Sequence, residues 1–320
     1  MATVRSLSVV SFAWFLLLAL PTWSWAHGFA GQRFFPTTLA VEDPFVSDEL
    51  SFLLSHTKEP RQGEEPPTGS TEFSVDYTKR ITPRLGLSLG GSYLHLNPEE
   101  GSTENGFGNL DVGAKYQLIT LASAEVLFSF GLTAEVGGTG ARSVGADSFS
   151  TLSPSIFFGK GFGDLPETVP FLRPFALTGA FAANIPTRKQ TVTTQVDPLS
   201  GDLSQETELH PITFSWGLTL QYNLQYLQTF VKDVGLGAPF NRMIPLIEFP
   251  METCLNRGCG GQTTGTINPG LIWFGKYIEL GAEATIPINS RSGKNVGALF
   301  LVHFFIDDLF PHSLGRPLFP

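Results

Sequence analysis

The sequence predicts an all-β fold, namely a closed antiparallel transmembrane β-barrel of about 12 strands with a periplasmic N-terminal arm and a short periplasmic helix. Three observations lead to this prediction. An export signal opens the chain, long segments alternate between apolar and polar residues, and the connections between them are alternately short and long. The composition agrees, because 42% of the residues are hydrophobic and only 15% are charged, which is few charges for a soluble surface.

Residues 1–26 have the features of a cleaved export signal. Arg5 gives a basic start, residues 6–20 form an apolar run, and small residues flank the last tryptophan of the segment. An uncleaved membrane anchor is the alternative, but the run is short for a transmembrane helix and Pro21 interrupts it. Cleavage would release a mature chain that begins near His27 outside the cytoplasm.

Residues 27–48 follow the signal and precede the first long alternating segment. They carry enough apolar surface to dock against or inside a barrel, chiefly through four phenylalanines, Phe29, Phe34, Phe35 and Phe45. We expect either a periplasmic arm or a plug, and the sequence does not choose between them.

Residues 49–307 have the alternation of membrane-spanning strands. In residues 124–136, for example, Phe128 and Phe130 lie on one face and Ser129 and Thr133 on the other. A soluble sandwich also alternates, but its strands average about 5 to 6 residues, and these segments are longer. In lipid, strands must close into a barrel, because an open edge leaves backbone groups unpaired. The expected strands are 49–57, 72–82, 84–96, 106–119, 124–136, 150–163, 171–186, 209–224, 243–253, 264–275, 277–288 and 295–307.

The connections fit a barrel whose two chain ends are periplasmic. Short turns near 82–83, 120–124 and 275–276 alternate with long polar loops, which are expected outside the cell. One periplasmic connection, residues 225–242, is long instead. Its apolar residues have helical spacing and predict a short amphipathic helix, although a miscounted pair of strands is the alternative. The spacing is that of Leu227, Phe230, Val231 and Val234.

The last expected strand resembles the signal by which the assembly machinery of outer-membrane barrels recognises its substrates. The matching positions are Asn295, Gly297, Phe300, Val302 and Phe304. Residues 308–320 follow as a C-terminal tail, so the signal would be recognised internally. The resemblance places the protein in the outer membrane of a Gram-negative bacterium, with outer-membrane lipids and the barrel-assembly machinery as partners.

Three segments, residues 31–51, 264–289 and 296–311, resemble the outer-membrane transporters grouped with meta-pathway phenol-degradation proteins. The resemblance implies a channel or transporter for passive passage of small molecules, including hydrophobic or aromatic ones. It supplies no catalytic or binding residues. A structural or adhesive barrel without transport remains the alternative.

The polar faces of the strands carry charges of both signs, which would either select solutes or brace the lumen. Lys115 and Glu125 are expected on adjacent strands and close enough to pair. A barrel of about 12 strands leaves a narrow pore or needs a plug. Residues 27–48 could supply the plug, and so could loop 187–208 if it folds inward. The alternative for this loop is a surface loop. The candidate lumen-lining residues are Asp76, Arg84, Asp111, Lys115, Glu125, Glu135, Glu279 and Glu283.

The remaining chemistry of the sequence is sparse. Cys254 and Cys259, in an exported chain, predict a disulfide that closes a small loop. No cofactor or metal site is expected. We expect no enzyme, because no histidine stands two residues before a serine as a base for it; a lipid-modifying outer-membrane enzyme is the less favoured alternative. A net charge of -9 offers no nucleic-acid surface, and the oligomeric state stays open.

Overall fold

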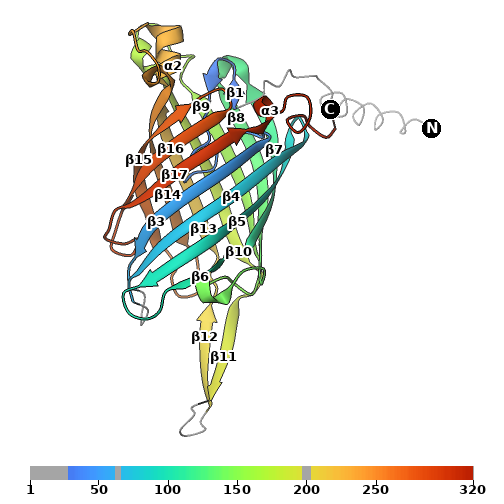
Figure 1. Cartoon of the computed structure of the whole chain (residues 1–320), viewed down its shortest axis with the longest axis vertical. Helices are drawn as coiled ribbons and strands as arrows, with labels where there is room; N and C mark the ends of the chain where they lie inside the picture. The colour runs from blue at the N-terminus through green and yellow to red at the C-terminus, as the bar shows by residue number, and fades with distance from the viewer. Residues whose placement is uncertain (1–27, 62–65, 197–202, 320) are drawn as a thin grey trace, which may run out of the picture.

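The computed structural model describes residues 28–61, 66–196 and 203–319, and in them twelve strands form a closed antiparallel barrel (Figure 1). The barrel closes where the last strand pairs with the first, with Leu301 opposite Leu53. The predicted fold class and strand order are therefore confirmed. The wall consists of β3 (Glu49–Glu59), β4 (Thr68–Thr82), β5 (Leu85–Pro98), β7 (Leu110–Leu121), β8 (Val126–Val136), β9 (Thr151–Gly161), β10 (Phe175–Pro186), β13 (Thr213–Tyr222), β14 (Met243–Cys254), β15 (Thr263–Phe274), β16 (Ile278–Pro287) and β17 (Gly297–Phe305).

Smaller elements join or extend these strands. The short strand β6 (Glu104–Phe107) lengthens the sheet beside the outer end of β5. The others are β1 (Phe29–Ala30), β2 (Arg33–Phe34), η1 (Ala122–Ala124), η2 (Arg142–Val144), η3 (Pro170–Leu172), β11 (Gln190–Val196), β12 (Leu203–Leu209), α2 (Leu224–Tyr226), η4 (Leu227–Val231), η5 (Phe240–Arg242) and α3 (Ile306–Leu309). The predicted signal segment, residues 1–26, and His27 lie outside the described residues.

The apolar face of the strands points outward. On β8, Phe130 and Leu132 are 46% and 51% exposed, whereas Ser129, which directly precedes Phe130, is fully buried. The same holds for β5, where Leu89 is 53% exposed and Gly90 is buried. A soluble barrel has the opposite arrangement, so this outer surface fits contact with lipid.

The inner face is not uniformly polar, which differs from the expected wet lumen. On β14 to β17 several inward-facing residues are apolar and buried, among them Ile272 and Leu301. They pack with Phe34 and Leu39 from the segment before β3. This explains why β17 is apolar on both faces: one faces lipid and the other faces chain inside the barrel.

The loop expected at 187–208 does not fold into the barrel. Its described residues form the hairpin of β11 and β12, which projects from the barrel end opposite α2 (Figure 1). β11 contains three threonines, Thr191, Thr193 and Thr194, a residue type favoured in strands. Of the two alternatives for this loop, the described residues therefore fit the surface loop and not the inward constriction.

The long periplasmic connection contains the predicted helix in shortened form. A continuous helical stretch, α2 with η4, runs from Leu224 to Val231, and the Asn223 side chain caps it by accepting a hydrogen bond from the Tyr226 backbone N–H at 2.9 Å. Val234, expected on its apolar face, lies beyond the helix and is 44% exposed. Within the described ranges, none of the helices has the length and apolar character needed to span a membrane.

Candidate functional site

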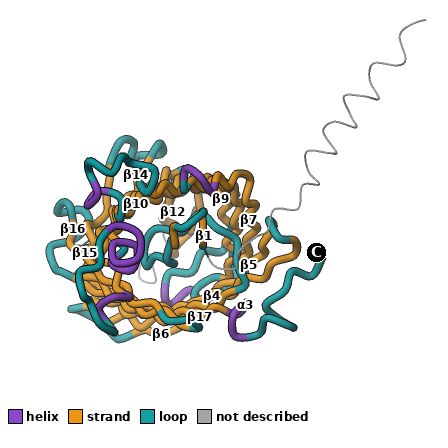
Figure 2. The backbone as a smooth tube through the Cα atoms, turned by 90° about the horizontal axis from the view of Figure 1, so that it is seen from above, coloured by secondary structure: helices purple, strands orange, loops and turns teal. Residues whose placement is uncertain are grey.

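Residues 28–48 lie inside the barrel and form the lumen segment, the name used below for this stretch. Seen from above, their trace crosses the interior of the ring of strands (Figure 2). Residues 33–39 and 43–48 are buried, whereas Ala40 and Glu42 at the tip are exposed to the lumen. Of the two alternatives for this stretch, the contacts described below are those of a plug.

The tip of the lumen segment is anchored on β14. The carboxylate of Glu248 accepts hydrogen bonds from the backbone N–H groups of Ala40 at 2.6 Å and Val41 at 3.3 Å. It also accepts one from the Thr219 hydroxyl at 2.9 Å. Glu248 is fully buried, so its oxygen atoms depend on these donors for their hydrogen bonds.

The opposite side of the tip is anchored on β7. The Lys115 ammonium lies 2.7 Å from the Glu42 carboxylate and 3.6 Å from that of Asp43, and it donates a hydrogen bond to the Asp43 carbonyl at 2.9 Å. Burial raises the pKa of Asp43 to about 6, although Lys115 opposes this shift. Glu248 and Lys115 therefore hold the tip from two different walls of the barrel.

The base of the lumen segment is fixed at the α2 end of the barrel by two ion pairs. Arg33 lies 3.1 Å from the Glu125 carboxylate, and its guanidinium stacks over the Tyr226 ring, 3.8 Å from the centroid. At the other end, Asp48 lies 2.7 Å from Arg80. Because the four charged groups of these pairs are almost completely buried, removing one partner would leave a charge without compensation.

The predicted pair between Lys115 and Glu125 is wrong. The register of β7 and β8 places Lys115 opposite Gly131. Glu125 precedes β8 at the rim, where it ends η1 in a left-handed conformation. Lys115 instead pairs with Glu42, and Glu125 pairs with Arg33, both of which belong to the lumen segment.

Inward-facing glycines make room for the lumen segment. A Cβ atom added to Gly217 would lie 2.7 Å from a Val41 methyl, and one added to Gly281 would lie 2.6 Å from a Leu39 methyl. On β9, a Cβ at Gly159 would come within 3.2 Å of the Phe35 ring. Three strands of the wall are thus shaped to the segment, as expected of close packing.

Two cavities remain in the lumen, one on each side of the tip. A cavity of about 320 Å³ is lined by Asp76, Asp111 and Lys115 together with the tip. The other, of about 380 Å³, is lined by Phe157, Pro250 and the same tip residues. Both cavities border residues 40–42, and they lie side by side at one depth of the barrel, since Gly131 in the first lining pairs with Ser155 in the second.

The other candidate lumen residues are distributed differently. Glu135 accepts a hydrogen bond from the Asn109 side chain at 2.8 Å, and Glu279 and Glu283 are 0% and 5% exposed on the inner face of β16. Arg84 is not on the strand where the sequence analysis placed it. It lies in the turn between β4 and β5, because the pairing of these strands ends at Thr82 and Leu85.

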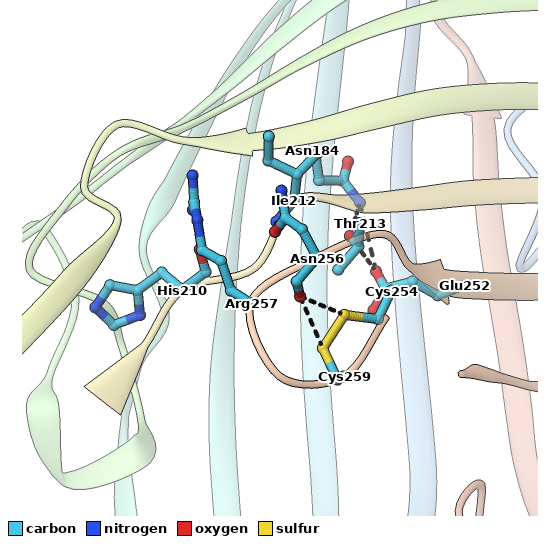
Figure 3. The surroundings of a disulfide bond; sticks show 9 residues. All are labelled: Asn184, His210, Ile212, Thr213, Glu252, Cys254, Asn256, Arg257 and Cys259. Carbon is cyan, nitrogen blue, oxygen red and sulfur yellow. Dashed lines mark hydrogen bonds between the residues drawn. A yellow bond between two sulfur atoms is a disulfide. The ribbon is translucent and has the colours of Figure 1, made fainter. Parts of the chain in front are cut away.

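A disulfide joins Cys254 and Cys259, whose Cα atoms are 5.7 Å apart (Figure 3). Within the loop that it closes, the Asn256 side chain accepts a hydrogen bond from the Ile212 backbone N–H at 2.9 Å. This bond ties the loop to the start of β13. In the described residues, no three or more His, Cys, Asp or Glu side chains are grouped to hold a metal ion.

No family model matches the chain, and no curated protein sequence matches it. Among solved structures it is similar to the COG4313 outer membrane channel from Pseudomonas putida F1, with a TM-score of 0.54 and 10% identity over 85% of this chain and 99% of that one. The NanC and KdgM porins align with TM-scores of 0.43 and 0.44 and identities of 10% and 11%, over 80% of this chain and 98% of theirs. The similarity shows the fold, that of outer-membrane β-barrels.

Proposed function

We propose that the protein is an outer-membrane channel for the passive passage of small molecules, and that the lumen segment closes it at rest. One observation carries the proposal: residues 33–39 and 43–48 of the segment are buried inside the barrel, and its tip is held between Glu248 and Lys115. The fold shared with a solved outer membrane channel supports it. Export by a cleaved signal, and assembly through Gly297, Phe300 and Phe304, belong to the same proposal.

The solutes we propose are small hydrophobic or aromatic molecules. This follows from the resemblance of three segments to phenol-degradation transporters, and the apolar inner face of β14 to β17 is compatible with it. Barrels of this strand number enclose far less space than porins of 16 to 18 strands. A structural or adhesive barrel is the competing function, and the projecting hairpin of β11 and β12 is the observation that favours it.

Single-channel recording in planar bilayers tests the proposal. Protein purified from outer membranes should give rare, discrete openings, and vesicles that contain it should take up a small neutral aromatic such as benzyl alcohol faster than vesicles with a sealed control barrel. Folding is checked by the heat-dependent shift in gel mobility that barrels show. A folded protein that stays silent, also when the lumen segment is released, would favour the structural barrel.

Replacing Lys115 by methionine should make openings more frequent. The substitution removes the cation that holds Glu42 and Asp43 and leaves the buried Asp43 carboxylate without its partner. Open probability in single-channel recordings is the measurement. The matched control is Lys160→Met, because Lys160 forms a partly exposed pair with Asp164 away from the segment. Equal behaviour of the two variants would contradict the role of Lys115.

Acid should close the channel further. The pKa of Asp43 is about 6 when the segment is docked and would return to about 3.9 on release. Asp43 therefore binds its proton more tightly in the docked state than in the released state. The free energy of docking becomes more favourable as pH falls through 6, and the total gain is at most about 3 kcal/mol. We expect open probability to drop from about pH 7.5 to about pH 5. The same drop in Asp43→Asn would contradict the assignment.

A further inference from the structure

The C-terminal tail, here the described residues 308–319, lies outside the barrel wall. After β17, α3 leads the chain away from the lumen, and the tail then runs beside the periplasmic ends of β4 and β5, outside the ring of strands (Figure 2). It is not a loose end, because it is hydrogen-bonded to the wall.

The end of the tail is hydrogen-bonded to the periplasmic end of β4. The first residue of β3, Glu49, pairs with Thr78, so the part of β4 beyond Thr78 extends past its neighbour. The tail occupies that place: Leu318 N–H donates to the Arg80 carbonyl at 3.2 Å, and Phe319 N–H donates to the Ile81 carbonyl at 2.8 Å.

Two basic side chains of β4 fix the middle of the tail. The Lys79 ammonium donates to the carbonyls of Leu314 and Arg316, both at 2.7 Å, and Arg80 donates to the carbonyl of Gly315 at 2.9 Å. The path of the tail is therefore set by backbone groups, and its side chains remain available.

The apolar side chains of the tail are left uncovered. Phe310, Leu314, Leu318 and Phe319 are 46%, 56%, 59% and 65% exposed. Apolar surface in water is unfavourable by about 25 cal/mol per Å², and several such residues held in one place mark a contact surface.

The outer face of the neighbouring strands β5 and β7 is also apolar, which indicates that lipid covers the apolar side chains of the tail. Leu87 lies opposite Lys79 in the pairing of β4 with β5 and is 45% exposed on the outer face. On β7, Ile119 and Leu121 are 40% and 52% exposed near the same end. The apolar outer surface of the barrel thus continues into the tail.

We infer that the tail is a membrane-interface anchor, with Phe310, Leu314, Leu318 and Phe319 set at the boundary between headgroups and acyl chains of the periplasmic leaflet. Aromatic and apolar side chains are favoured at that depth, next to basic groups that face the headgroups, and the exposed Arg316 lies there. The inference goes beyond the proposed function, since it requires only that the barrel spans a bilayer.

Depth-dependent quenching of tryptophan fluorescence tests the anchor. Beyond residue 26 the sequence has two tryptophans, Trp216 and Trp273, and replacing both by phenylalanine gives a silent background. Phe319→Trp is then introduced, and the protein is purified from outer membranes and reconstituted with lipids brominated at different depths.

Two further variants in that background calibrate the result. Leu87→Trp reports a wall position in lipid, and Val234→Trp, 44% exposed in the long periplasmic connection, reports water. We expect Phe319→Trp to emit at short wavelength and to reach at least half the quenching of Leu87→Trp, strongest for bromines near the headgroups. Quenching and emission closer to those of Val234→Trp would overturn the inference. Quenching of Leu87→Trp shows that the tryptophan-free protein folds and inserts into the bilayer. Weak quenching of Phe319→Trp can therefore not be attributed to failed folding.

Discussion

A variant that lacks residues 28–46 is expected to conduct ions continuously, with a unitary conductance several-fold above the openings of the complete protein. The deletion removes the buried residues that fill the lumen together with the tip, and it keeps Asp48, which pairs with Arg80 at the rim. Nothing else in the described part of the lumen bridges Glu248 to Lys115. Conductance in planar bilayers measures the effect.

The deletion also exposes apolar lumen residues such as Ile272 and Leu301, so its folding needs its own control. The heat-dependent gel shift shows whether the barrel has closed. A synthetic peptide of residues 28–46, added to the open variant, should reduce the current again. A folded variant with the low conductance of the complete protein would mean that the segment does not limit the pore.

Glu248→Ala is expected to give the largest effect of a single substitution. It leaves the N–H groups of Ala40 and Val41 without an acceptor, and a buried donor without a partner costs about 1 to 3 kcal/mol. Loss of about 3 kcal/mol changes the ratio of closed to open states by roughly a hundredfold. Open probability, with unitary conductance unchanged, is the measurement.

Glu252→Ala is the matched control for this substitution. Glu252 also lies on β14, four residues further along the same face, but it accepts hydrogen bonds from Thr213 and Asn184 of the wall. It makes no hydrogen bond to the tip among the described contacts. If both variants opened the channel equally, general weakening of the wall would explain the result better than release of the tip.

The barrel itself could be predicted from the sequence because the alternation of apolar and polar residues is visible within each strand. Successive side chains of a strand point alternately to the lipid and to the lumen. The outward position of Phe130 and the inward position of Ser129 on β8 can therefore be predicted from this strand alone. Strand length and the alternation of short and long connections then give the strand order. The disulfide between Cys254 and Cys259 was predictable for the same reason, since its partners are close in sequence.

The contacts of the lumen segment could not be predicted, because they join residues far apart in the chain. Glu248 binds Ala40, and Lys115 binds Glu42, across the interior of a closed barrel. The sequence pattern of the wall predicted a pair of Lys115 with Glu125 instead, because the two were expected on adjacent strands near one turn. A signal was nevertheless present: β17 is apolar at consecutive positions, which a wall between lipid and water would not need.

A reversible covalent lock tests the central claim most directly. A Cβ atom added at Gly217 would lie 3.3 Å from the Val41 Cβ, close to the separation of about 3.5 to 4.5 Å found in disulfides. In the variant Val41→Cys with Gly217→Cys, oxidation should abolish all openings in single-channel recordings, and reduction should restore them, while the unmodified protein responds to neither treatment. Openings of the same size and frequency in the oxidised variant, with the disulfide verified by mass spectrometry, would contradict closure by the lumen segment.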